Sequence, residues 1–103
     1  MAEQQETPLP TSAVLMAISK HIAVRLDSVN RAYMRCKQKD ANPEACVAEG
    51  DAVTAGVIDL LKELNAKAPK ELKAYYSCLD YYSNKFSKCR VEQKAFEEAA
   101  PVS

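Results

Sequence analysis

The segment YMRCKQKDANPEAC, residues 33–46, decides the fold because it contains two cysteines at a separation that one helix cannot bridge. In a continuous helix, Cys36 and Cys46 would lie about 15 Å apart along the axis, whereas a disulfide requires Cα atoms about 5–6 Å apart. Such a helix would also contain Pro43 in its interior, where proline removes a hydrogen bond. Asn42, directly before this proline, is a typical helix start. The segment therefore predicts a helical hairpin, with the two cysteines on facing helices near the turn.

A second pair of cysteines has nearly the same spacing. Cys78 and Cys89 lie on either side of a weaker break at residues 83–84. We therefore favour the disulfides Cys36–Cys46 and Cys78–Cys89. Each would close a loop of about a dozen residues, which on the chain-entropy account is worth roughly 2.5–3 kcal/mol.

Other states of the four cysteines remain open at this point. Four cysteines permit three connectivities, and sequence alone does not choose among them. Four free buried thiols in a reducing compartment are the alternative to any disulfide. A zinc site has less support because the C-x2-4-C spacing is absent and no histidine lies close in the sequence. A thioredoxin-like site would need C-x-x-C, which the chain lacks.

The remaining sequence predicts an all-α fold in which two disulfide-stapled helical hairpins follow an extended arm and a short helix. Pro8 and Pro10, without apolar periodicity around them, indicate the arm. Ser12 is a candidate N-cap for the first helix, and Asp27 or Ser28 for the next. We expect an arm over 1–11, an N-terminal helix over 12–26, a first hairpin over 27–66 and a second hairpin over 67–103. The apolar face that opens the second hairpin is expected to carry Leu72, Tyr75, Leu79 and Tyr82.

The length and composition exclude a large catalytic fold and favour a small protein that needs staples or partners. The chain has 103 residues and no Trp, and many of its hydrophobic residues are alanine, so bulky side chains for a core are few. Fourteen basic residues balance 14 acidic ones, which gives no general attraction for nucleic acid or anionic membrane. No stretch approaches the roughly 20 apolar residues that span a bilayer. The single histidine, His21, has no metal-binding or catalytic grouping around it and is expected to be an ordinary helix residue.

Several short blocks in the same order carry a resemblance to a known family. They are Ser12-Ala-Val-Leu15, Tyr33-Met-Arg-Cys-Lys37, Asn42-Pro-Glu-Ala-Cys46, Asp59-Leu-Leu-Lys62, Cys89-Arg-Val-Glu-Gln93 and Ala95-Phe-Glu97. From Ser12 onward the chain resembles the plant and algal form of the PGIV-type accessory subunits of mitochondrial complex I, the NADH dehydrogenase 1 alpha subcomplex subunit 8 family. These are CX9C helical-hairpin (CHCH) proteins.

The resemblance implies a structural subunit with no catalytic site and no cofactor. It implies a location in the mitochondrial intermembrane space, peripheral on the inner membrane, where family members hold neighbouring subunits of the membrane arm together. They are thought to enter through the oxidative disulfide relay. The expected partners are other complex I subunits, with no nucleic acid and no small-molecule substrate.

The family typically has eight cysteines in two hairpins, each with an inner and an outer disulfide, and this chain has four. By spacing, the absent cysteines would stand at Leu26, Gly56, Ala68 and Ala100. The family pattern would pair Leu26 with Gly56 and Ala68 with Ala100, so each absent disulfide lacks both halves. The resemblance thus supports the two inner disulfides and implies hairpins whose open ends depend on packing.

Two tyrosine doublets supply candidate contact residues. In Tyr75-Tyr76 and Tyr81-Tyr82, only one ring of each doublet can point into the hairpin. We therefore expect Tyr76 and Tyr81 to be available to a partner, together with the extended arm. Two rival functions remain: an assembly factor that leaves the finished complex, and a metal chaperone. A metal chaperone of this helical-hairpin group usually needs an adjacent cysteine pair, which this sequence lacks.

Overall fold

The computed structural model describes residues 7–102, and these residues form helices without any strand. The all-α prediction is therefore confirmed. In chain order the elements are α1 (Ser12–Ala17), α2 (Ser19–Arg25), α3 (Asp27–Lys39), the 3₁₀ turn η1 (Pro43–Cys46), α4 (Val47–Lys67), α5 (Pro69–Tyr81), the 3₁₀ turn η2 (Phe86–Lys88) and α6 (Arg90–Ala99). None of the helices within residues 7–102 combines the length and apolar character needed to cross a bilayer.

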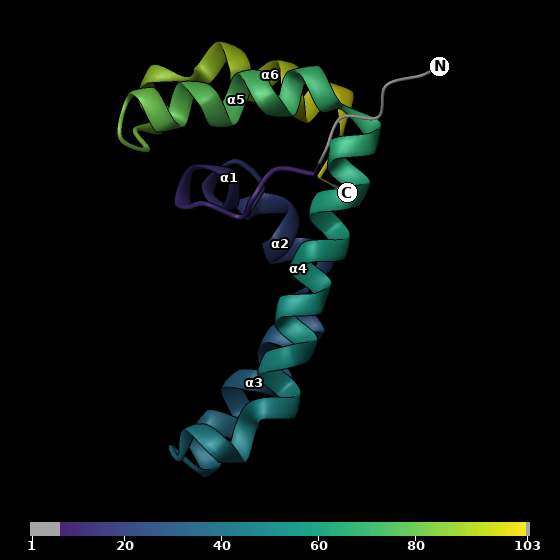
Figure 1. The fold of residues 1–103 in the computed structure, drawn as a ribbon, viewed down its shortest axis with the longest axis vertical. Coiled ribbons are helices and arrows are strands. Elements are labelled where there is room, and N and C mark those ends of the chain that lie inside the picture. The colour runs from purple at the N-terminus through teal and green to yellow at the C-terminus, as the bar shows by residue number, and fades with distance from the viewer. Residues whose placement is uncertain (1–6, 103) are drawn as a thin grey trace.

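The helices build two arms that meet near the junction of α4 and α5 (Figure 1). One arm consists of α3 running beside the long helix α4. The other consists of α5 and α6 side by side, with α1 packed against α5. The principal extents are 43 × 37 × 24 Å and the radius of gyration is 15.1 Å. A compact domain of this length would have a radius of gyration of about 13 Å, so the fold exposes more surface than a globular packing would.

The N-terminal helix expected over residues 12–26 is divided into α1 and α2. The division falls at Ile18, whose backbone leaves helical geometry (φ −100°, ψ 11°) while its side chain stays fully buried. The Ser19 hydroxyl donates a hydrogen bond to the Met16 carbonyl at 2.8 Å, a local contact of the kind that bends helices. Thr11 replaces Ser12 as the N-cap, because its hydroxyl accepts from the Val14 amide at 3.4 Å.

The start of the next helix also differs from the prediction. Leu26, with φ −111° and ψ 20°, occupies the cap position before α3, and no side chain caps this helix. Asp27 and Ser28 therefore do not act as N-caps. Asp27 instead lies in the first turn, where its carboxylate accepts from Arg31 at 2.9 Å and complements the positive end of the helix.

The hydrophobic core lies almost entirely in the second arm and its junction. It joins α1, the C-terminal end of α4, α5 and α6. The larger side chains that form it are Ile18, Leu61, Leu64, Leu72, Tyr75, Leu79 and Phe96. Tyr82, expected on the same apolar face as Leu72 and Leu79, is exposed. The prediction fails there because α5 ends at Tyr81 and Tyr82 takes the cap position with non-helical geometry.

The first hairpin has almost no core of its own. Helix α3 contains no buried residue, and the buried residues of α4 lie near its C-terminal end, from Leu60 to Asn65. Of residues 27–59, only Cys46 is buried. The disulfide and close helix packing therefore have to supply most of what holds this arm together.

Two glycines of α4 permit that close packing. A Cβ atom at Gly56 would lie 3.0 Å from Leu26 Cδ2, and a Cβ atom at Gly50 would lie 3.3 Å from Tyr33 Cε1. Both bulky side chains thus fill space that the glycines leave open. Leu26 and Gly56 are the pair of positions at which the family resemblance places an outer disulfide, and packing joins them here.

Replacing Gly56 by Leu tests this packing. The added side chain would overlap Leu26, and overpacking of this kind typically costs about 1–3 kcal/mol. We expect a lower free energy of unfolding in urea, followed by circular dichroism, and partial recovery when Leu26 is also replaced by Ala. Ala55→Leu, at the exposed neighbouring position, is the control and should change stability by less than about 0.5 kcal/mol. Equal losses in the two variants would contradict the packing role.

Candidate functional site

Each hairpin is closed by a disulfide near its turn. Cys36 is bonded to Cys46 with a Cα–Cα distance of 5.9 Å, and Cys78 to Cys89 with 6.0 Å. The pairing favoured from the spacing is confirmed, and none of the four cysteines is free. The free-thiol and zinc alternatives are therefore not what the structure shows.

Short polar side chains build the first turn. The Asp40 carboxylate accepts from the Asn42 amide at 2.9 Å, and Asn42 Oδ1 accepts from the Glu44 amide at 3.1 Å. Pro43 follows as the first residue of η1, where its missing N–H leaves no bond unmade. The helix start predicted at Asn42 and Pro43 is thus confirmed, and the turn places Cys46 opposite Cys36.

The second turn depends on backbone geometry that few residues adopt. Ser83 and Asn84 have positive φ angles of 55° and 63°, a region that asparagine tolerates better than most residues. The Asn84 amide donates to the Leu79 carbonyl at 2.6 Å, and the Asn84 side-chain amide donates to the Ser12 hydroxyl at 3.3 Å. The weak break in the sequence is therefore a defined turn that also contacts the start of α1.

The two disulfides lie in different surroundings. Cys89 is fully buried and belongs to the main hydrophobic core, with Cys78 packed against it. Cys46 is also buried but lies outside that core, in the first hairpin. The second disulfide therefore crosslinks residues of the core, whereas the first closes an arm that has little other burial.

Removing each disulfide should therefore have unequal consequences. On the chain-entropy account each closed loop is worth about 2.8 kcal/mol. We expect Cys36→Ser/Cys46→Ser to lose amide hydrogen-exchange protection in α3 and the first half of α4, with the core still protected. Cys78→Ser/Cys89→Ser should lower the protection of the whole core. Matching exchange profiles in the two variants would show that the arm and the core are a single cooperative unit.

One group of potential metal ligands occurs within residues 7–102: Cys78, Cys89 and Glu92, whose ligand atoms lie within 4.8 Å of one another. Two of these three residues are joined in the disulfide. Thiolates, not disulfide sulfurs, are the strong ligands for zinc and copper, so the oxidised chain offers only the Glu92 carboxylate here.

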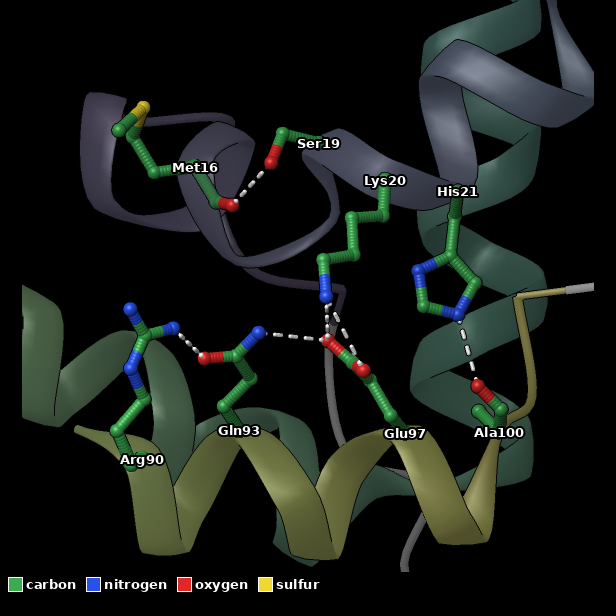
Figure 2. A network of polar contacts seen from close by, with 8 residues as sticks. All are labelled: Met16, Ser19, Lys20, His21, Arg90, Gln93, Glu97 and Ala100. Atoms are coloured by element: carbon green, nitrogen blue, oxygen red, sulfur yellow. Dashed lines mark hydrogen bonds and ion pairs between the residues drawn. The ribbon is translucent and has the colours of Figure 1, made fainter. Parts of the chain in front are cut away.

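A polar network connects α2 to α6 across the second arm (Figure 2). Lys20 Nζ lies 3.2 Å from Glu97 Oε2, which also accepts from Gln93 Nε2 at 3.0 Å. Arg90 in turn donates to Gln93 Oε1 at 2.7 Å. Burial by itself raises the pKa of Glu97, but the hydrogen bonds from Gln93 and Lys20 and the charge of Lys20 outweigh it and lower that pKa. The carboxylate stays charged and anchors the network.

His21 contributes the other contact between α2 and the C-terminal segment. Its ring is almost fully buried, and Nε2 lies 2.8 Å from the Ala100 carbonyl oxygen. Since a carbonyl only accepts, Nε2 carries the proton. The ring also packs on Phe96, with centroids 5.1 Å apart, while Nδ1 has no hydrogen-bond partner. His21 is thus a core residue that fixes the end of α6, a role that its local sequence does not signal.

The four tyrosines of the doublets have distinct environments. Tyr75 is buried, and burial raises its pKa to about 12. Tyr76 is partly buried against the core and lines a shallow groove with Pro8 and Leu9 of the N-terminal arm. Tyr81 is 79% exposed and Tyr82 41% exposed, and their rings meet edge to face with centroids 4.8 Å apart. Tyr81 therefore offers the most accessible ring, and Tyr76 offers one edge beside the arm.

These features define a class of protein: a CHCH-like chain of helical hairpins stapled by disulfides between cysteines 10 and 11 residues apart in the sequence. The chain is 50% identical to NADH dehydrogenase [ubiquinone] 1 alpha subcomplex subunit 8-A of Arabidopsis thaliana over 95 aligned residues. These residues make up 92% of this chain and 88% of the relative. It is 48% identical to subunit 8-B of the same plant, covering 92% and 90%. The chain belongs to the NADH dehydrogenase 1 alpha subcomplex subunit 8 family, as its sequence blocks predicted. No family model matches the chain.

Proposed function

We propose that this chain is an accessory, non-catalytic subunit of mitochondrial respiratory complex I, NADH:ubiquinone oxidoreductase. The observation that carries the proposal is the 50% identity to a relative named as an alpha subcomplex subunit of that enzyme, over nearly the whole of both chains.

The proposed location is the intermembrane-space side of the membrane arm, peripheral on the inner membrane. The two disulfides support this location because disulfides persist where the environment is oxidising and are rare where thiols are kept reduced. The resemblance to the subunit 8 family also implies the intermembrane space. The first hairpin fits such a compartment because it has almost no core of its own and is held by a disulfide that an oxidising environment preserves.

The proposed role is to stabilise neighbouring subunits through surface contacts. The two arms expose more surface than a compact chain of this length would. A subunit that binds only the folded form of its neighbour stabilises that neighbour. Tyr76 and Tyr81 are the proposed contact residues. Tyrosine suits this role because it buries a large apolar ring and keeps a polar end for hydrogen bonding.

The test of the proposal is comigration with the enzyme. Gently solubilised mitochondria that contain this chain are resolved on a native gel, and the chain is followed by mass spectrometry across the size range. We expect one copy of the chain to comigrate with each mature complex I. Migration only at low mass or in subassemblies would refute the subunit role and favour an assembly factor or a metal chaperone, which metal analysis of the purified chain would separate.

The tyrosine contacts have their own test. Tyr81→Ser, alone and combined with Tyr76→Ser, should reduce the fraction of the chain in complex I because interface tyrosines often contribute 1 kcal/mol or more, about fivefold in affinity. Val24→Ser, which removes another half-exposed apolar side chain, is the control. Circular dichroism should show folded protein in each case. Unchanged incorporation of the folded double variant would rule out these contacts.

A further inference from the structure

The closed end of the second hairpin combines exposed aromatic rings with unpaired positive charge. From Tyr81 to Val91 the chain carries three basic residues and no acidic one. Arg90 donates to Gln93 and belongs to the network described above. Lys85 and Lys88 are exposed, and within residues 7–102 neither takes part in an ion pair. We call Tyr81, Tyr82, Lys85 and Lys88 the tip patch.

The nearest acidic residues in the sequence form no ion pair with these lysines. Asp80 lines the groove beside Pro8 and Leu9, and the Glu92 carboxylate lies within 4.8 Å of the sulfurs of Cys78 and Cys89. The tip patch therefore keeps its positive charge available to another molecule.

The tip patch is rigid before any partner arrives. The disulfide joins its two sides, and Asn84 ties the turn to Leu79 and to Ser12 of α1. Backbone hydrogen bonds from Lys85 to Tyr82 and from Lys88 to Lys85 continue through η2. The relative positions of the tyrosine and lysine backbones are thus set in advance, which lowers the entropy lost on binding.

We infer that the tip patch docks onto an acidic segment of a neighbouring protein subunit. This inference rests on the proposed function and specifies the partner chemistry at Tyr81. The paired rings would cover apolar surface of that segment, and the two lysines would approach its carboxylates. Complementary charge of this kind fixes register and excludes wrong partners.

The rigidity favours a protein partner over an anionic bilayer. Lipid headgroups are mobile and can follow many arrangements of charge, so the affinity for a bilayer does not depend on a preformed backbone. The backbone here is held by a disulfide and by two residues with positive φ. A folded partner with fixed carboxylates gains from it, because complementary positions need no rearrangement. Two lysines also provide less charge than the clusters of four to eight that mark binding to anionic lipid.

The first experiment compares two charge variants in intact complex I. Lys85→Gln/Lys88→Gln removes the charge of the tip patch, and Lys70→Gln/Lys73→Gln removes the same charge from exposed positions of α5. The chain remaining with the complex on native gels is measured at rising NaCl. We expect the tip variant to dissociate about fivefold more readily than wild type, and the α5 variant to behave as wild type. Equal release of both variants and wild type would overturn the inference.

A second experiment identifies the partner with the charges intact. Tyr82 is replaced by a photo-reactive phenylalanine analogue in the full chain, and adducts in isolated complex I are mapped by mass spectrometry. Crosslinks to a peptide rich in Asp and Glu are expected. Crosslinks to phospholipid, to a peptide without acidic residues, or to nothing would overturn the inference. If wild type itself does not comigrate with complex I, the proposed function fails and the inference fails with it.

Discussion

The reversal of the chain between each pair of cysteines is the constraint on which the rest of the structure depends. A disulfide holds two Cα atoms about 6 Å apart, whereas ten residues of helix would separate them by about 15 Å. Each pair can therefore close only if the chain turns between its members. Once both pairs are closed, α3 must run back beside α4, and α5 beside α6. The two arms of the molecule follow from this requirement.

The two arms meet the shortage of bulky apolar residues in different ways. The second arm and its junction contain nearly all of the buried ones, and there Phe96 and Tyr75 pack in one core with α1, the end of α4 and the buried Cys89. The first arm has no such core and depends on close helix contact, in which Leu26 fills the space above Gly56. Where the family pattern would place a second disulfide in this arm, the chain has a large side chain facing a glycine. Packing here takes the place of a covalent bond.

This division suits a protein that works through its surface. The most buried polar side chain within residues 7–102, that of His21, joins α2 to the end of α6. At the closed end of the second arm, Tyr81 and two lysines are exposed on a turn that the Cys78–Cys89 disulfide closes. Membership of the subunit 8 family and the extended shape of the molecule both fit the proposed role of an accessory subunit that contacts its neighbours.

The sequence predicted most of the helices and both turns, because these depend on signals a few residues apart, such as Asn42 before a proline. It favoured the disulfide pairing that the structure shows without excluding the other pairings. It also determined the family, through short blocks in a fixed order. The docking of distant helices sets three features that the sequence did not predict. The N-terminal helix bends at Ile18, His21 bonds a carbonyl 79 residues away, and Tyr76 is partly covered while Tyr81 is exposed. These outcomes depend on how distant helices dock, and the apolar periodicity of one helix gives the face that is buried but not the element that buries it.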